Sequence, residues 1–179
     1  IVYLPLGIDT LFYKPPSNNK LRLSEKVILH VGRNRRDFHT LKEVFLLIQK
    51  KFPKVKLELV GGDIARSLFS NIKNVTFHSF ISDDDLLQIY QRATILLLPL
   101  KEGGSSQTLN EAMSTGLPII TNDLPNLQDY FPDNNSVLLS STGDVQTMAS
   151  QSIELLDNPE LWHKVSNNIR QHSKSFDFQ

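Results

Sequence analysis

No cysteine occurs among the 179 residues, so the chain has neither disulfide bonds nor a metal site built on thiolates. No apolar run approaches the roughly 20 residues that a membrane-spanning helix needs. Basic and acidic side chains balance at 19 each and give a formal net charge of zero, which excludes the broad basic field that attracts nucleic acid or anionic lipid. We therefore expect a cytoplasmic location, with at most peripheral contact with a membrane.

Motifs for common cofactors are missing as well. No G-x-G-x-x-G segment follows a predicted strand, which argues against a dinucleotide cofactor. The five histidines show no pair at metal-ligand spacing, and we expect neither a metal ion nor a cofactor. The acidic run 83–85 follows Ser82 and directly precedes an amphipathic segment. We interpret it as the capped first turn of a helix and not as a metal site.

Apolar runs and helical periodicities alternate along the chain. Strands are predicted at residues 27–32, 55–60, 75–78, 95–98, 119–121 and 136–139, and helices at residues 41–52, 64–69, 86–93, 107–115, 145–156 and 161–172. This alternation is typical of a three-layer, Rossmann-like α/β domain with a mostly parallel sheet of about six strands. The chain begins at Ile1 and not at methionine, so we expect native residues to precede it.

The most informative stretch runs from residue 95 to residue 120. Residues 95–98 are apolar without alternation, as expected for a strand that is covered on both faces. The small residues Gly103, Gly104, Ser105 and Ser106 follow, and then a predicted helix. A glycine and serine turn between a strand and a helix start lets a ligand approach the backbone and the free N–H groups of the helix. This arrangement predicts an anion site, most often for phosphate.

Glu111 has two interpretations. Thr108 and Glu111 have the spacing of a capping box, in which the glutamate occupies the third position of the helix. Alternatively, the carboxylate accepts hydrogen bonds from a sugar diol beside the bound phosphates. Local chemistry alone favours the cap, and the wider pattern around Glu111 favours the ligand.

Residues 102–120 resemble the donor-site signature of the group 1 glycosyltransferases (family 4), which have the GT-B fold. That signature has two glutamates around a glycine-containing loop, then Ala-Met, Gly, Pro and a strand. The resemblance implies that Glu111 binds the ribose of a sugar nucleotide and that Glu102 lies near the transferred sugar. The family separates its two glutamates by seven residues and this chain by eight, so strict register places Gly103 in the first position.

A second resemblance follows the first predicted strand. Gly32-Arg33 matches a family feature in which this arginine and a lysine about five residues later hold the donor diphosphate. Phe38 occupies the lysine position here, and Arg36-Asp37-Phe38 resembles a family variant that carries its basic group as Arg-Asp-aromatic. The resemblance therefore implies that Arg33 and Arg36 bind the diphosphate. The alternative for both is a solvated basic turn.

Taken over nearly the whole chain, the resemblance implies the donor-binding half of a retaining glycosyltransferase. Such an enzyme moves a hexosyl group from a UDP or GDP sugar to a hydroxyl of a glycan, lipid or other acceptor, as in polysaccharide biosynthesis. Residues 1–179 would form one domain, with 1–20 as the linker leading into it, and the N-terminal acceptor-binding half would lie outside this sequence. The implied catalytic residues are Glu102, Arg33 and Arg36, and the implied donor-binding residues are Gly32, Gly103, Gly104, Ser105, Ser106, Thr108, Leu109 and Glu111.

Two other classes of protein remain open on the sequence alone. One is another enzyme of the same fold, such as a sugar-nucleotide epimerase or a phosphorylase. The other is a non-catalytic module that binds a nucleotide or a glycan, which the shifted Glu102 and the missing lysine favour. No residue is a convincing general base for an acceptor hydroxyl, so we expect the isolated chain to have little or no transfer activity.

Overall fold

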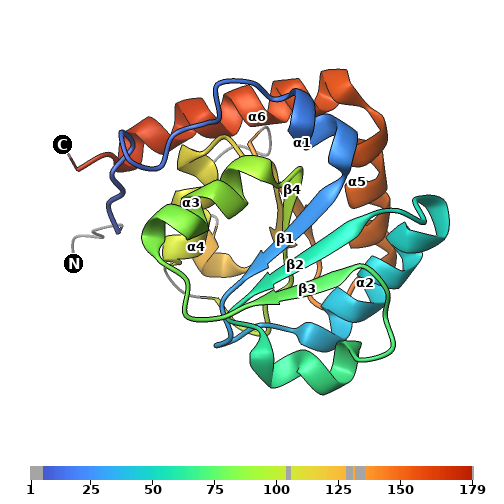
Figure 1. The fold of residues 1–179 in the computed structure, drawn as a ribbon. Helices are drawn as coiled ribbons and strands as arrows, with labels where there is room; N and C mark the ends of the chain where they lie inside the picture. The colour runs from blue at the N-terminus through green and yellow to red at the C-terminus, as the bar shows by residue number, and fades with distance from the viewer. Residues whose placement is uncertain (1–5, 104–105, 128–130, 132–135, 179) are drawn as a thin grey trace.

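The computed structural model describes residues 6–103, 106–127, 131 and 136–178. Its centre is a six-stranded, fully parallel sheet with the order β3-β2-β1-β4-β5-β6 (Figure 1). The strands are β1 (Val27–Val31), β2 (Lys56–Val60), β3 (Val75–His78), β4 (Ile95–Leu98), β5 (Ile119–Asn122) and β6 (Leu138–Ser140). The predicted α/β fold with about six strands is therefore confirmed.

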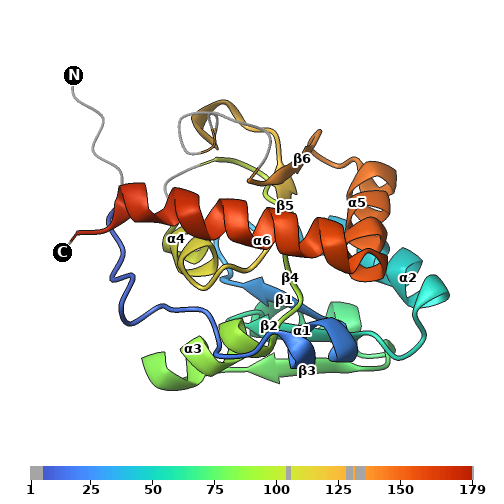
Figure 2. The same ribbon diagram turned by 90° about the horizontal axis from the view of Figure 1, so that it is seen from above.

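Helices cover both faces of the sheet and make the outer two layers. They are α1 (Lys20–Glu25), α2 (Phe38–Lys51), α3 (Asp83–Arg92), α4 (Gln107–Ser114), α5 (Val145–Asp157) and α6 (Pro159–Ser173), with the 3₁₀ turns η1 (Asp63–Phe69), η2 (Pro125–Leu127) and η3 (Lys174–Phe176). One core lies between the sheet, α3 and α4, and the other lies between the sheet, α2 and α5. Helix α6 runs past α4 and α5 (Figure 2) and contacts both.

The strand order fixes where a ligand can bind. The chain builds outward from β1 through β2 to β3 and then returns to place β4 on the other side of β1. The loops that follow β1 and β4 therefore separate toward opposite faces of the sheet. In open α/β sheets, ligands bind at the carboxyl ends of the strands at such a switch point. The loop after β4 belongs to residues 95–120, the most informative stretch of the sequence.

Helix α3 begins as its sequence predicts. The side chain of Ser82 accepts a hydrogen bond from the backbone N–H of Asp85, and the three aspartates occupy the first turn. The helix-cap interpretation of the acidic run is confirmed, because these carboxylates face the positive end of the helix dipole.

Replacing this cap gives a modest, measurable effect. We expect Ser82→Ala to lower the free energy of unfolding by about 1 kcal/mol, since the N–H of Asp85 loses its partner. Urea unfolding followed by circular dichroism measures this difference. Ser82→Asp, which restores an acceptor at the same position, should recover most of the loss. An alanine variant as stable as the wild type would contradict the capping role.

Two local features differ from the sequence predictions. Helix α1 was not predicted, and it buries Arg22. The described residues before it, 6–19, form the expected irregular lead-in. Strand β6 begins at Leu138, later than the predicted start, and it lies at the edge of the sheet as expected. The lead-in also packs on the end of the chain, because the N–H of Ile8 donates to the carbonyl of Phe176 at 2.9 Å.

Candidate functional site

A cavity of about 400 Å³ lies at the switch point of the sheet. It opens between the loop after β1, the loop after β4 and the first turn of α4. The lining residues are Asn34, Arg35, Arg36, Leu100, Glu102, Ser106, Gln107 and Thr108. Two guanidinium groups and a helix N-terminus thus meet one carboxylate in a small polar cavity, and the balance of charge favours an anionic ligand.

The two loops that form the cavity are tied to each other. The N–H of Asp37 donates to Pro99 O, and the N–H of Lys101 donates to Arg35 O, each at 2.9 Å. The side chain of Arg35 adds a third link, from Nη1 to Gly103 O at 2.9 Å. Arg35 adopts a left-handed backbone with φ of 59°, which a non-glycine residue adopts at some cost. The loops therefore form one unit across the switch point.

Arg36 is the more buried cation of the site. Its Nε donates to the carbonyl of Val31 at 2.9 Å, and its Nη2 donates to Thr108 Oγ1 at 3.3 Å. These contacts aim the guanidinium at the first turn of α4, where the helix N–H groups also point. Burial lowers the pKa of Arg36, yet an arginine remains charged at neutral pH. The site therefore holds a fixed positive charge before any ligand arrives.

Gly32 makes room for that arginine. It has φ of +95°, and a Cβ at this position would lie 2.7 Å from Nη2 of Arg36. A side chain here would both strain the backbone and displace the guanidinium. The glycine predicted as a donor-binding residue thus acts in the structure by admitting Arg36.

Helix α4 begins at Gln107, as predicted, but its first turn is not a capping box. Ser106 occupies the N-cap position, and its side chain makes no capping hydrogen bond. Thr108 lies inside the helix, so Glu111 is too far along to reach the N-cap backbone. The capping interpretation of Glu111 is therefore wrong. Among the described residues, no side chain caps the first N–H groups of α4, which form a wall of the cavity.

Glu111 instead faces two tyrosines in the core beside α3. Its Oε2 accepts a hydrogen bond of 2.9 Å from the hydroxyl of Tyr90, and Tyr13 interacts with the same carboxyl group. Only 7% of Glu111 is exposed. Burial raises its pKa to about 7, against the opposing effect of the hydrogen bonds from Tyr90 and Tyr13. A carboxylate held in this way can accept two hydroxyl groups of a diol when it is ionised.

Other predicted site residues have varied surroundings. Leu109 is fully buried and packs in the core between α4 and the sheet. Glu102 is exposed and lines the cavity, whereas Arg33 is exposed and does not line it. Gly103 takes part through its carbonyl, which accepts from Arg35. Gly104 and Ser105 lie outside the described residues.

Sequence reasoning missed several residues that line the cavity or contact Glu111, among them Arg35, Tyr90 and Tyr13. Arg35 belongs to the same basic turn as Arg33 and Arg36. The sequence therefore indicated a basic residue at this turn but did not show which of the three arginines line the cavity. Tyr90 read only as part of the apolar face of a helix, and Tyr13 as part of an irregular lead-in. Both reach Glu111 through contacts far apart in the chain, for which local patterns give no signal.

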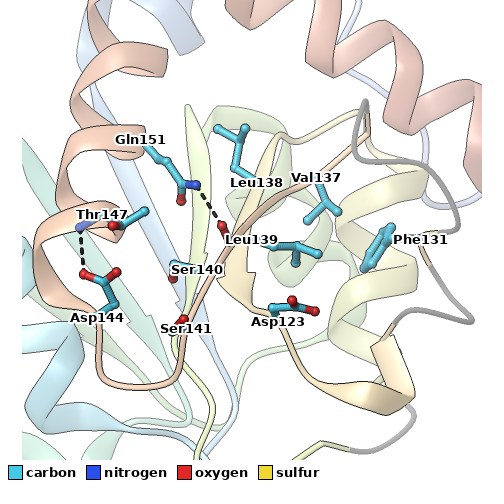
Figure 3. Close-up of a pocket in the computed structure, with 10 residues that line it drawn as sticks. All are labelled: Asp123, Phe131, Val137, Leu138, Leu139, Ser140, Ser141, Asp144, Thr147 and Gln151. Carbon is cyan, nitrogen blue, oxygen red and sulfur yellow. Dashed lines mark hydrogen bonds between the residues drawn. The ribbon is translucent and has the colours of Figure 1, made fainter.

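A second cavity, of about 730 Å³, lies beyond β5 between β6 and α5 (Figure 3). Two of its polar side chains make hydrogen bonds within the fold. The carboxylate of Asp144 caps α5 by accepting from the N–H of Thr147, and Gln151 Nε2 donates to Leu139 O at 2.9 Å. The described residues that line this cavity include no basic side chain, whereas Arg35, Arg36 and the start of α4 line the cavity at the switch point, which therefore remains the better candidate for an anionic ligand.

Two further searches concern metals and membranes. Within the described ranges, no group of three or more histidine, aspartate or glutamate side chains is arranged to hold a metal ion. In the same part of the chain, every helix is too short or too polar to cross a membrane.

Comparison with known proteins identifies the family. The model of the family described as "Glycosyl transferases group 1" matches residues 14–172. The chain belongs to this family. The expected relationship is thus confirmed for a segment that includes every residue lining the switch-point cavity.

Two curated relatives illustrate the range of this glycosyltransferase family. An uncharacterized glycosyltransferase from Haemophilus influenzae is 27% identical over 172 residues, which are 90% of this chain and 48% of the relative. The N-acetyl-alpha-D-glucosaminyl L-malate synthase of Bacillus anthracis is 24% identical over 155 residues, covering 83% of this chain and 40% of that enzyme. The chain spans less than half the length of both relatives.

Solved glycosyltransferase structures share the fold. The C-terminal domain of the group 1 family protein LpcC from Francisella tularensis matches with a TM-score of 0.80 at 16% identity, covering 97% of this chain and all of that domain. A mutant of S. aureus TarM in complex with UDP and other ligands matches with a TM-score of 0.75 at 19% identity, over 91% of this chain and 35% of TarM. The domain is thus one Rossmann-like half of the GT-B fold.

Proposed function

We propose that this chain is the donor-binding half of a retaining glycosyltransferase that uses a UDP or GDP hexose. The acceptor, a glycan, lipid or other hydroxyl compound, would be bound by a further domain that residues 1–179 do not include. The observation that carries this proposal is the convergence at the switch point. There, Arg36 and the uncapped start of α4 meet in one cavity, and the buried Glu111 lies further along the same helix.

The chemistry of transfer assigns a role to each group. When the bond between the anomeric carbon and the diphosphate breaks, negative charge develops on the diphosphate. Arg36 and the N–H groups of α4 would stabilise this charge, since both are fixed before the reaction. Arg33 is free to approach from the exposed side, and Glu102 or the backbone at Gly103 would contact the sugar. Glu111 would accept the two ribose hydroxyls.

The members of this site have no general base for an acceptor hydroxyl. We therefore propose that the isolated chain binds the nucleotide and has little or no transfer activity, which requires the acceptor-binding half. The TarM mutant, whose structure was solved in complex with UDP, supports the choice of uridine nucleotides for the first trial. Product analysis with a protein that contains both halves would separate transfer from epimerisation or phosphorolysis.

Calorimetry with UDP, GDP and ADP tests the proposal. We expect one nucleotide to bind the wild type, and Arg36→Ala to weaken it by roughly 10- to 100-fold, the range for a lost hydrogen bond to a charged group. Arg33→Ala should weaken binding less, because Arg33 is exposed. Lys51→Ala serves as the matched control, since Lys51 pairs with Asp157 at the far end of α2.

Two outcomes would contradict this assignment. Binding of no nucleotide by folded wild-type protein would overturn the donor-site proposal. Binding that is lost equally in Arg36→Ala and Lys51→Ala would show a general charge effect, and the switch-point cavity would not be the site.

A further inference from the structure

We propose that Tyr90 and Tyr13 are positioning residues for nucleotide binding, which act by holding the Glu111 carboxylate in the geometry that accepts a sugar diol. This inference rests on the proposed function of the site. It extends that site from the loops at the cavity to α3 and to the irregular segment before α1.

The contacts around Glu111 come from three separate parts of the chain. Tyr90 projects from α3 and donates its hydroxyl to Glu111 Oε2 at 2.9 Å, with a longer contact of 3.5 Å to Thr108 O. Tyr13 lies before α1 and packs edge-on against Tyr90, with ring centroids 6.3 Å apart. A glutamate side chain has three rotatable bonds, and two aromatic neighbours in the core restrict them without consuming all of its lone pairs.

These contacts also connect the two halves of the proposed ligand site. Arg36 donates to the hydroxyl of Thr108, and Tyr90 contacts the carbonyl of the same residue. Thr108 thus lies between the guanidinium proposed for the diphosphate and the tyrosine that holds Glu111. A nucleotide bound across this network would meet groups whose relative positions are already fixed.

The two tyrosines favour the charged form of Glu111, which is the form that accepts two hydroxyl groups. Both hydrogen bonds lower the pKa of the carboxyl group, whereas burial and the carboxylate of Asp83 on α3 raise it. Arg36, from the loop after β1, is a cation that interacts electrostatically with Tyr90. Removing a tyrosine hydroxyl should therefore raise the pKa of Glu111 further, and the change should appear as a shifted pH profile of binding.

The test is nucleotide titration of wild type, Tyr90→Phe and Tyr13→Phe between about pH 6 and about pH 9, using the nucleotide that binds best among UDP, GDP and ADP. We expect wild-type affinity to increase as the pH rises through the titration of Glu111. In Tyr90→Phe, we expect the pH profile of nucleotide affinity to move to higher pH. The Kd at neutral pH should be about three- to tenfold higher than in the wild type, and the two Kd values should converge toward the alkaline end of the range. A terminal phosphate titrates near pH ~6 itself, so each variant is compared with the wild type at equal pH.

Ser152→Ala is the matched control. It removes a buried hydroxyl that donates to Met148 O at 2.7 Å within α5, on the other side of the sheet. It should keep the wild-type profile even if it lowers stability by as much as Tyr90→Phe. Tyrosine variants whose profile superimposes on that of the wild type, or whose affinity falls equally at every pH, would overturn the positioning role alone. Wild-type protein that binds no nucleotide would overturn the proposed function and this inference with it.

Discussion

The Arg22→Met variant is expected to lose about 3–5 kcal/mol of unfolding free energy, the range for breaking a buried charged network. Arg22 is only 1% exposed. Its Nε and Nη2 donate to the carbonyls of Gln91 and Tyr90, each at 2.8 Å, and its Nη1 donates to Thr115 O at 3.1 Å. These carbonyls lie in the last turn of α3 and at the C-cap of α4, where the helix supplies no N–H donors for them.

Among the described residues, the hydrogen-bond partners of the Arg22 guanidinium are all backbone carbonyls, and the two helix ends explain this arrangement. Each helix presents the negative end of its dipole to the guanidinium, so the charge is balanced without a carboxylate. Burial lowers the pKa of Arg22 to about 9, and the group remains protonated at neutral pH. Methionine fills a similar volume but leaves the carbonyls without a donor, which is why a large loss is expected.

Urea unfolding followed by circular dichroism measures the loss. Leu21→Met is the matched control on the same helix, because Leu21 is 69% exposed and surface changes of this kind stay within about ±0.5 kcal/mol. If Arg22→Met unfolds within about 1 kcal/mol of the wild type, the guanidinium does not hold the ends of α3 and α4 together.

Glu111→Gln is expected to raise stability at alkaline pH while removing nucleotide binding. The pKa of Glu111 rises from 4.5 in the unfolded chain to about 7 in the folded one, because burial disfavours the charge. Between these values the folded protein keeps a proton that the unfolded chain releases. The free energy of unfolding therefore falls as the pH rises through this window and levels off above it.

Glutamine has no proton to lose, so the variant should show a flat profile through the same window. Near pH ~8 it should be more stable than the wild type by up to about 3 kcal/mol, which is the pKa difference expressed as free energy. The amide oxygen can still accept from Tyr90, so packing is preserved. An amide is neutral and offers one acceptor where a diol needs two, so binding should be lost.

Urea unfolding at about pH 5 and about pH 8 checks the stability effect. Glu43→Gln, at an exposed position on α2, makes the same chemical change without removing a buried charge. Equal pH slopes in the wild type and in Glu111→Gln would show that the carboxyl group does not titrate in this window. A gain of stability together with a loss of binding would identify Glu111 as a residue kept for function at a cost to the fold.

The fold was largely predictable because its signals are local. Buried parallel strands show as apolar runs such as residues 95–98, and amphipathic helices show as repeats such as the one that follows Ser82. Glycine-containing turns separate them. These patterns need only a few neighbouring residues, so the order of elements and the parallel sheet follow from the sequence.

The site was predictable only in part. The basic turn was singled out because it follows the first predicted strand, where ligands bind in α/β sheets. Glu111 was singled out because the stretch around it resembles the donor-site signature of the family. Tyr90 and Tyr13 were not, because their contacts with Glu111 and with each other join separate elements of the chain. Arg22, outside the site, was missed for a similar reason, since its carbonyl partners lie at least 68 positions further along the chain. The capping box proposed for Thr108 and Glu111 was wrong because Ser106 occupies the N-cap position, and the Glu111 carboxylate instead accepts from Tyr90, a contact that local spacing does not reveal.

The links between the loops after β1 and β4 have a dynamic consequence. Backbone hydrogen bonds at Asp37 and Lys101, with the Arg35 side chain on Gly103, join segments that lie on either side of the switch point. A movement that widens the cavity mouth by displacing one segment alone would have to break these hydrogen bonds. We therefore expect the linked residues of the two segments to move together when a ligand enters or leaves.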